Sequence, residues 1–106
     1  MRIPIDECLD WRLKREFPEH VAMRVTDMGW RGTKNGALLS LAQSQFDVFV
    51  TSDRNLQFQN VAANYSIAVV VFASLSTRLG DTLLLVPKLL GMLNQLQPGT
   101  VTIIHP

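Results

Sequence analysis

The sequence of 106 residues predicts an α/β fold, a parallel sheet of about five strands between two layers of helices. Short apolar runs typical of strands alternate along the chain with segments that have helical spacing. The runs at 48–50 and 67–73 are almost entirely apolar, as expected of central parallel strands buried on both faces. The length is that of one domain, and no repeat divides it. We therefore expect a single three-layer domain over residues 1–106.

Each expected strand is a short run rich in Val, Ile or Phe. The five strands are expected at residues 2–6, 20–25, 47–52, 67–73 and 101–104.

Helical spacing of apolar residues predicts helices over 8–17, 35–45 and 77–96. The inward face of the helix at 8–17 is expected to hold Cys8, Leu9, Leu13 and Phe17. The inward face of the helix at 35–45 is expected to hold Ala37, Leu38, Leu41 and Ala42. The third would present Leu79, Leu83, Val86, Leu90, Leu93 and Leu96. Pro87 should kink it, because proline has no N–H to donate to the preceding turn.

Charge is distributed unevenly along the chain. The formal net charge is +1, which neither requires nor excludes a nucleic-acid partner. Eight of the ten basic residues and eight of the nine acidic residues lie in residues 1–54. A second half so poor in charge predicts a partner chain or a dimer, with the Leu-rich helix as the contact.

The sequence also bears on compartment. The longest apolar run, 67–73, is far shorter than the roughly 18 residues needed to cross a bilayer. No basic segment followed by an apolar stretch opens the chain, so we expect a cytoplasmic protein. Cys8 is the only cysteine and is expected to be a small buried apolar residue.

Carboxylates follow two of the expected strands. Asp6 and Glu7 end the first strand and Asp53 ends the third, and parallel strands bring their carboxyl ends to one edge. Clustered carboxylates repel unless a proton, an Arg or a cation compensates them. Mg²⁺ or Mn²⁺ suits such oxygen ligands and can activate water against a phosphodiester. The alternative is structural: Asp6 and Asp53 cap helices or turns, and Glu7 is solvated.

Phosphoacceptor receiver domains also have an acidic pair after the first strand and one Asp after the third. They need a Lys at the end of their last strand. Here that strand reads VTIIHP, and Lys88 lies in the expected helix, so this alternative is disfavoured.

Three segments, IDECLDWRLKREFP, VTDMGWRGTKNGALLSLA and FDVFVTSDRNLQFQN, give the chain a family resemblance. It resembles the small bacterial PIN-like domains, relatives of VapC-type toxin ribonucleases, over essentially its whole length. The resemblance implies a Mg²⁺- or Mn²⁺-dependent endoribonuclease, the toxin component of a toxin–antitoxin pair, restrained by a cognate antitoxin protein.

The resemblance also implies roles for individual residues. Asp6 and Asp53 would be metal ligands and, with Glu7, the catalytic residues, while the Thr51 hydroxyl would support Asp53. The residues expected near the RNA are Thr51, Arg54, Lys34, Asn35 and Asn55.

Two departures from the family pattern support a second hypothesis. Lys34 and Asn35 stand where PIN domains usually have an acid near the start of the central helix, and Asn55 stands where many have another. Asn can coordinate a hard cation but adds no charge, so metal affinity should be weaker. The chain could then be a catalytically degenerate PIN-like module that binds protein or RNA. Asp10 and Asp47 are alternative ligands, but they are better explained as a helix-surface residue and the start of a strand.

Basic and aromatic residues offer a possible RNA surface. The basic candidates are Arg12, Lys14, Arg15, Arg24, Arg31, Lys34 and Arg54, with Trp11 and Trp30 for base stacking. The first three are more simply the solvated side of the first helix. Arg54, next to Asp53, should pair with that carboxylate or contact a phosphate. His20 and His105 are interpreted as structural.

Overall fold

The fold is a five-stranded, all-parallel sheet, seen in a computed structural model that describes residues 1–33, 35–54 and 61–106. The strands are β1 (Arg2–Ile5), β2 (Val21–Arg24), β3 (Val48–Thr51), β4 (Ala68–Phe72) and β5 (Val101–Ile104). Their order is β2-β1-β3-β4-β5, and every neighbouring pair is parallel. The predicted α/β class and all five strands are confirmed, with each boundary within one residue.

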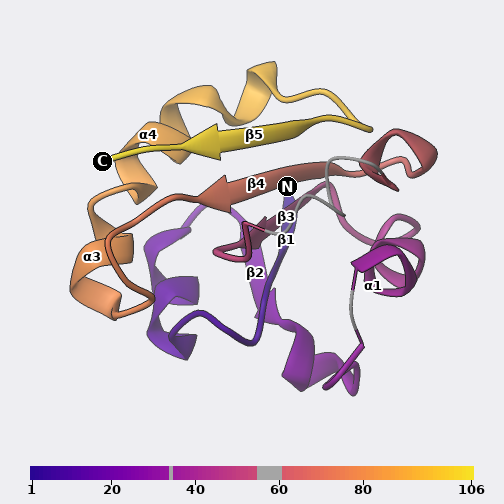
Figure 1. Cartoon of the computed structure of the whole chain (residues 1–106), viewed down its shortest axis with the longest axis horizontal. Helices are drawn as coiled ribbons and strands as arrows, with labels where there is room; N and C mark the ends of the chain where they lie inside the picture. Colours follow the sequence, from indigo (N-terminus) through magenta and orange to yellow (C-terminus); the bar gives the residue numbers. More distant parts are fainter. Residues whose placement is uncertain (34, 55–60) are drawn as a thin grey trace.

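Two apolar cores, one on each face of the sheet, make the fold three-layered (Figure 1). One face is covered by η1 (Trp11–Glu16), α3 (Leu79–Leu83), α4 (Val86–Met92) and η4 (Leu93–Gln95). The other is covered by η2 (Val25–Met28), α1 (Asn35–Ala42) and η3 (Ala62–Asn64). Along β4, Val70 and Phe72 belong to the first core while Val69 and Val71 belong to the second. This alternation explains why β4 is apolar at every position.

The first predicted helix is shorter than expected. A 3₁₀ helix begins only at Trp11, because the Asp10 carboxylate accepts a hydrogen bond from the backbone N–H of Arg12 (2.9 Å) and so acts as its N-cap. Leu9, Leu13 and Phe17 are buried as predicted. Cys8 is exposed, contrary to the prediction, because it lies in the turn between β1 and η1.

Helix α1 turns a different face inward from the one predicted. Leu38, Leu39 and Ala42 are buried, whereas Ala37 and Leu41 are exposed. The spacing of apolar residues allows either face, and contact with Phe49 and Val69 of the sheet in the same core selects the one containing Leu39.

The predicted long helix over 77–96 is broken into separate helices. Helix α3 ends at Leu83, and α4 begins at Val86 with Pro87 in its first turn. A proline there loses no hydrogen bond, since the first N–H groups of a helix are unpaired in any case. Pro87 therefore helps to start α4 and does not kink a continuous helix. Leu89 is buried and Leu90 is exposed, the reverse of the expected face at this turn.

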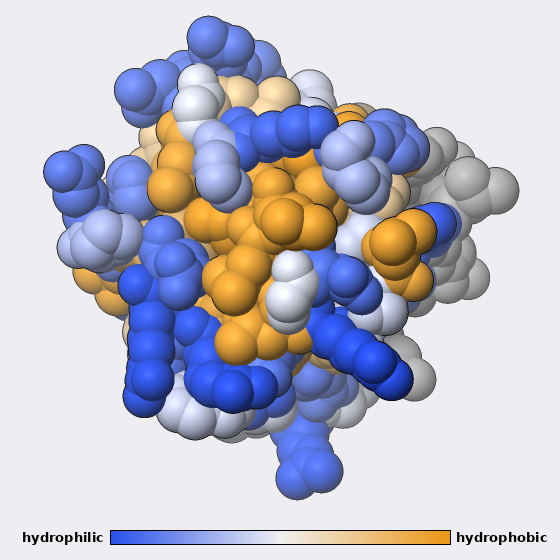
Figure 2. All heavy atoms as spheres, turned by 90° about the vertical axis from the view of Figure 1, so that its left-hand side faces the viewer, coloured by the Kyte–Doolittle hydropathy of each residue, from blue (hydrophilic) through white to orange (hydrophobic). Residues whose placement is uncertain are grey.

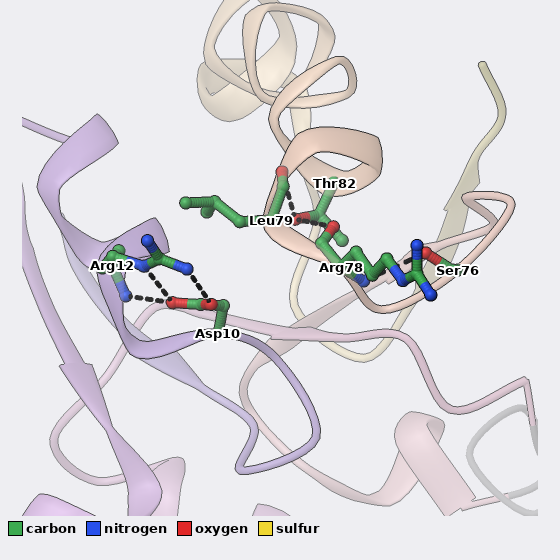
Figure 3. A network of polar contacts seen from close by, with 6 residues as sticks. All are labelled: Asp10, Arg12, Ser76, Arg78, Leu79 and Thr82. Carbon is green, nitrogen blue, oxygen red and sulfur yellow. Dashed lines mark hydrogen bonds and ion pairs between the residues drawn. The ribbon is translucent and has the colours of Figure 1, made fainter.

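Helix α3 lies against η1, and Figure 3 shows the hydrogen bonds at the start of α3 and at the cap of η1. The buried Thr82 hydroxyl donates to the backbone carbonyl oxygens of Arg78 (3.2 Å) and Leu79 (3.1 Å). The Arg78 N–H donates to the Ser76 hydroxyl (3.1 Å). These local bonds hold the loop from β4 into α3.

The face of the molecule that includes α3 exposes a group of hydrophobic side chains surrounded by hydrophilic ones (Figure 2). In the charge-poor second half of the chain, the large hydrophobic residues described as exposed are Leu75 (89% exposed), Leu84 (66%), Ile103 (42%) and Leu90 (39%). No helix among the described residues has the length and apolarity needed to cross a membrane.

Candidate functional site

The carboxyl ends of β1 and β3 form the centre of the candidate site. From β1 the chain first forms β2 on one side of β1 and then forms β3 on its other side. The strand order therefore reverses between β1 and β3. Open α/β sheets bind ligands at such a point, beyond the carboxyl ends of the strands. The N–H of Asp6 donates to the carbonyl of Val50 (2.9 Å), which keeps Asp6 and Glu7 beside the end of β3.

Thr51 joins the two predicted metal ligands. Its side chain is fully buried, and its hydroxyl donates to Asp6 Oδ2 (2.6 Å) while accepting from the backbone N–H of Asp53 (3.0 Å). The other Asp6 oxygen accepts from the N–H of Glu7 (2.8 Å). Asp6 is therefore fixed at the edge of the sheet, and it does not cap η1, because Asp10 occupies that position.

Cys8 is a member of this cluster that the sequence did not indicate. Its sulfur lies 3.5 Å from Asp6 Oδ2 and 3.2 Å from the Ser52 hydroxyl. Partial burial of the sulfur raises the pKa of the Cys8 thiol, the hydrogen bond to Ser52 lowers it, and the negative charge of Asp6 raises it further. The net pKa shift is upward, so the thiol stays neutral at pH 7 and can donate to Asp6. The only sequence signal for this contact is that Cys8 follows Asp6 by two residues.

Glu7 connects the edge to the loop that follows η2. Its Oε1 atom accepts from the backbone N–H of Gly32 (3.3 Å), and its carbonyl oxygen accepts from Nη2 of Arg24 (3.4 Å). Glu7, Arg24, Thr26 and Arg31 line a solvent-open pocket of about 450 Å³. Glu7 is thus half-buried and held in place, unlike the freely solvated residue of the structural alternative.

The guanidinium of Arg54 donates to the backbone carbonyl of Ser74 (2.5 Å), an interaction that the sequence did not predict. Ser74 is buried just beyond the end of β4. The Arg54 side chain therefore links the edge at β3 to the edge at β4.

The remaining predicted site residues divide into two groups. Lys34 and Asn55 lie outside the described residues, and Asn35 is described only as the first residue of α1. Asp47 is at the opposite edge of the sheet, where its Oδ2 accepts from the N–H of Arg2 (2.8 Å). Asp10 pairs with Arg12, so neither of the alternative acids belongs to the site.

Several basic and aromatic candidates are engaged in local contacts. Arg12 pairs with Asp10 (2.8 Å), Lys14 is 3.8 Å from Asp27, and the guanidinium carbon of Arg15 lies 4.6 Å from the centre of the Trp11 ring. Trp30 packs edge-on against Phe46, with ring centres 6.0 Å apart. These contacts agree with the interpretation of Arg12, Lys14 and Arg15 as a solvated surface.

The donors at the edge suit a hard cation in their chemistry. Asp6 and Asp53 offer carboxylate oxygens, and Mg²⁺ in proteins is commonly held by one or two carboxylates together with water and substrate phosphate. Within residues 1–33, 35–54 and 61–106, no group of three or more His, Cys, Asp and Glu side chains is arranged to hold a metal ion. Among these described residues the edge therefore offers the carboxylates of Asp6 and Asp53 but no three-residue ligand set.

The chain matches no protein-family model, no curated protein and no solved structure in the three comparisons made.

Proposed function

We propose that the chain is a Mg²⁺- or Mn²⁺-dependent endoribonuclease that acts at the carboxyl edge of β1 and β3. The observation that supports this most is the arrangement of Asp6, Thr51 and Asp53. Two acids from adjacent strands stand at the point where strand order reverses, and one buried hydroxyl bonds to both residues.

Each residue at the edge has a distinct role in this proposal. Asp6 and Asp53 would hold the cation, which when bound supplies a water of lowered pKa and compensates phosphate charge. The Thr51 hydroxyl bonds to one Asp6 oxygen and the N–H of Glu7 bonds to the other, and together they restrict rotation of the carboxylate. Glu7, tethered by Gly32, stands beside Asp6 as an acceptor for a proton released during hydrolysis.

The proposal includes partners and compartment. As the toxin component of a toxin–antitoxin pair, the chain would act on RNA in the cytoplasm and be bound by a cognate antitoxin protein. The exposed Leu75, Leu84 and Leu90 are apolar surface available for self-association into a dimer.

The second candidate function is RNA or protein binding without catalysis. It is favoured by the absence, among the residues described, of a cluster of three acids or other ligands. Lys34, Asn35 and Asn55 in place of acids point the same way.

Cleavage of a labelled pool of single-stranded RNA in Mg²⁺ or Mn²⁺ distinguishes the two. We expect cutting by the wild type and by Asp47→Asn, whose carboxylate lies at the opposite edge, and none by Asp6→Asn or Asp53→Asn. Circular dichroism must show that all four proteins are folded. Wild type that binds the RNA without cutting it would support the binding module, and cutting that survives in both Asp6→Asn and Asp53→Asn would place any activity elsewhere.

A further inference from the structure

A pocket lined by Glu7, Arg24, Thr26 and Arg31 lies beside the proposed site, and of these four residues only Glu7 has a role in the cleavage described above. Arg24 is the last residue of β2 and is paired in register with Ile5, the residue before Asp6. The pocket is therefore next to the acids along the same edge of the sheet. Two of its four lining residues are arginines, which makes its lining positively charged overall.

Arg24 has unused hydrogen-bonding capacity. Its Nη2 donates to the carbonyl of Glu7 at 3.4 Å, close to the limit of a hydrogen bond. Its Nε atom is buried and has no hydrogen-bond partner among the described residues. A buried charged donor without a partner is costly, so an anion in the pocket that drew the guanidinium toward it would relieve that cost.

Arg31 is presented to the pocket by a short, anchored loop. Gly29 and Gly32 adopt left-handed backbone conformations (φ 78° and 79°), which glycine tolerates best. Between them, Trp30 is fixed by its N–H bond to the carbonyl of Val25 (3.1 Å) and by its ring contact with Phe46. The Arg31 side chain makes no ion pair or hydrogen bond to any residue that the structure describes.

The one acid in the pocket is already partly used. Glu7 Oε1 accepts from Gly32, which leaves two guanidinium groups and the Thr26 hydroxyl as the groups able to bind an anion. Guanidinium groups match the tetrahedral oxygens of phosphate, to which they donate paired hydrogen bonds. A carboxylate ligand could bind to the same groups. Phosphate is the better candidate because a nucleic-acid strand bound here could also reach a cation held by the neighbouring Asp6 and Asp53.

We propose that this pocket binds a phosphate group of a single RNA strand, next to the phosphodiester that meets Asp6 and Asp53. The identity of the strand rests on the proposed ribonuclease function. The binding itself needs only Arg24, Arg31 and Thr26, and so does not depend on cleavage.

Fluorescence anisotropy with a labelled single-stranded oligouridylate in excess EDTA tests the pocket separately from catalysis. The informative variant is Arg31→Gln, because Arg31 is exposed and its loss should leave the fold intact. Arg2→Gln is the matched control, since it removes one exposed positive charge at the opposite edge of the sheet. We expect Arg31→Gln to weaken binding about tenfold and Arg2→Gln to leave it nearly unchanged.

Salt dependence provides a second readout. Loss of one phosphate contact should reduce the slope of log K against log salt by about 0.7 in Arg31→Gln but not in Arg2→Gln. Equal affinity and slope for wild type and Arg31→Gln would overturn the proposal. An equal loss of RNA affinity in Arg31→Gln and Arg2→Gln would also overturn it, because it would indicate a general effect of charge. If binding depends on Arg31 but no RNA is cut in Mn²⁺, the pocket stands and the ribonuclease proposal fails. If RNA is cut in Mn²⁺ but Arg31→Gln binds RNA as tightly as the wild type, the ribonuclease proposal stands and the pocket proposal fails.

Discussion

Thr51 is the residue on which the geometry of the candidate site depends most. It is fully buried, and its single hydroxyl serves Asp6 as a donor and the Asp53 backbone as an acceptor. A β-branched residue is favoured at the end of a central strand, but Val would serve that purpose equally well. The hydroxyl is therefore explained by the two acids and not by the sheet.

Replacing Thr51 tests this explanation. Thr51→Val keeps the shape but leaves Asp6 and the N–H of Asp53 without this partner, so the free energy of unfolding should fall by about 1–3 kcal/mol. Thr51→Ser retains the hydroxyl and should lose less. Urea denaturation of the three proteins measures the difference. Wild-type stability in Thr51→Val would show that the hydroxyl does not hold the edge together.

Asp10 provides a prediction about pH. Hydrogen bonds from the Arg12 side chain and backbone lower the pKa of the Asp10 carboxyl from 3.8 to about 2. Because the folded-state pKa is the lower one, the charged Asp10 favours the folded state above pH 3.8, and this contribution is lost as the pH falls toward 2. An NMR titration of side-chain carboxyl groups should find Asp10 still charged at pH 3. In Arg12→Gln its midpoint should rise toward 3.8, and an unchanged midpoint would contradict the assignment.

At the level of elements, the strands could be predicted from the sequence and the helices only in part. Central parallel strands are buried on both faces, so their apolar runs stand out, as in β4. Helical spacing does not show where a helix begins when a polar side chain decides it, as Asp10 does for η1. Nor does it distinguish a proline that kinks a helix from one that starts it, as Pro87 does for α4.

Neighbouring leucines in α4 test which face packs on the sheet. Leu89 is fully buried in the core with Leu85 and Ile104, whereas Leu90 is 39% exposed. Leu89→Ala should lower the free energy of unfolding by about 2–5 kcal/mol through the cavity it leaves. Leu90→Ala should cost much less. Thermal or urea unfolding that ranks the two variants in the opposite order would contradict the observed orientation of α4.

For the whole molecule, apolar surface remains in the half of the chain that is poor in charge. Leu75 and Leu84 are the most exposed large hydrophobic residues described, and the face that includes α3 has an apolar centre (Figure 2). We predict a dimer at micromolar concentration by sedimentation velocity, and a shift toward monomer in the double variant Leu75→Ser, Leu84→Ser. A monomeric wild type would show that a different partner, or none, covers this surface.

The candidate site was predictable from the sequence to the extent that chain geometry alone defines it. The positions of Asp6, Glu7 and Asp53 follow from the strands that precede them in a parallel sheet. The sequence does not show that Arg24 and Arg31, out of seven basic candidates, line the same pocket. Their proximity depends on the path of the loop between Gly29 and Gly32. Cys8 was misjudged for a similar reason, since the turn before η1 places it at the surface beside Asp6.

Calorimetric titration of the purified protein with Mn²⁺ tests whether the edge formed by β1 and β3 holds a metal ion. Asp53 and Asp47 flank the same strand at opposite ends, so Asp53→Asn and Asp47→Asn form a matched pair. We predict saturable, weak binding of Mn²⁺ to the wild type and to Asp47→Asn, and loss of this binding in Asp53→Asn. Absence of binding to the wild type, or equal binding to Asp53→Asn, would contradict a metal site at the edge formed by β1 and β3.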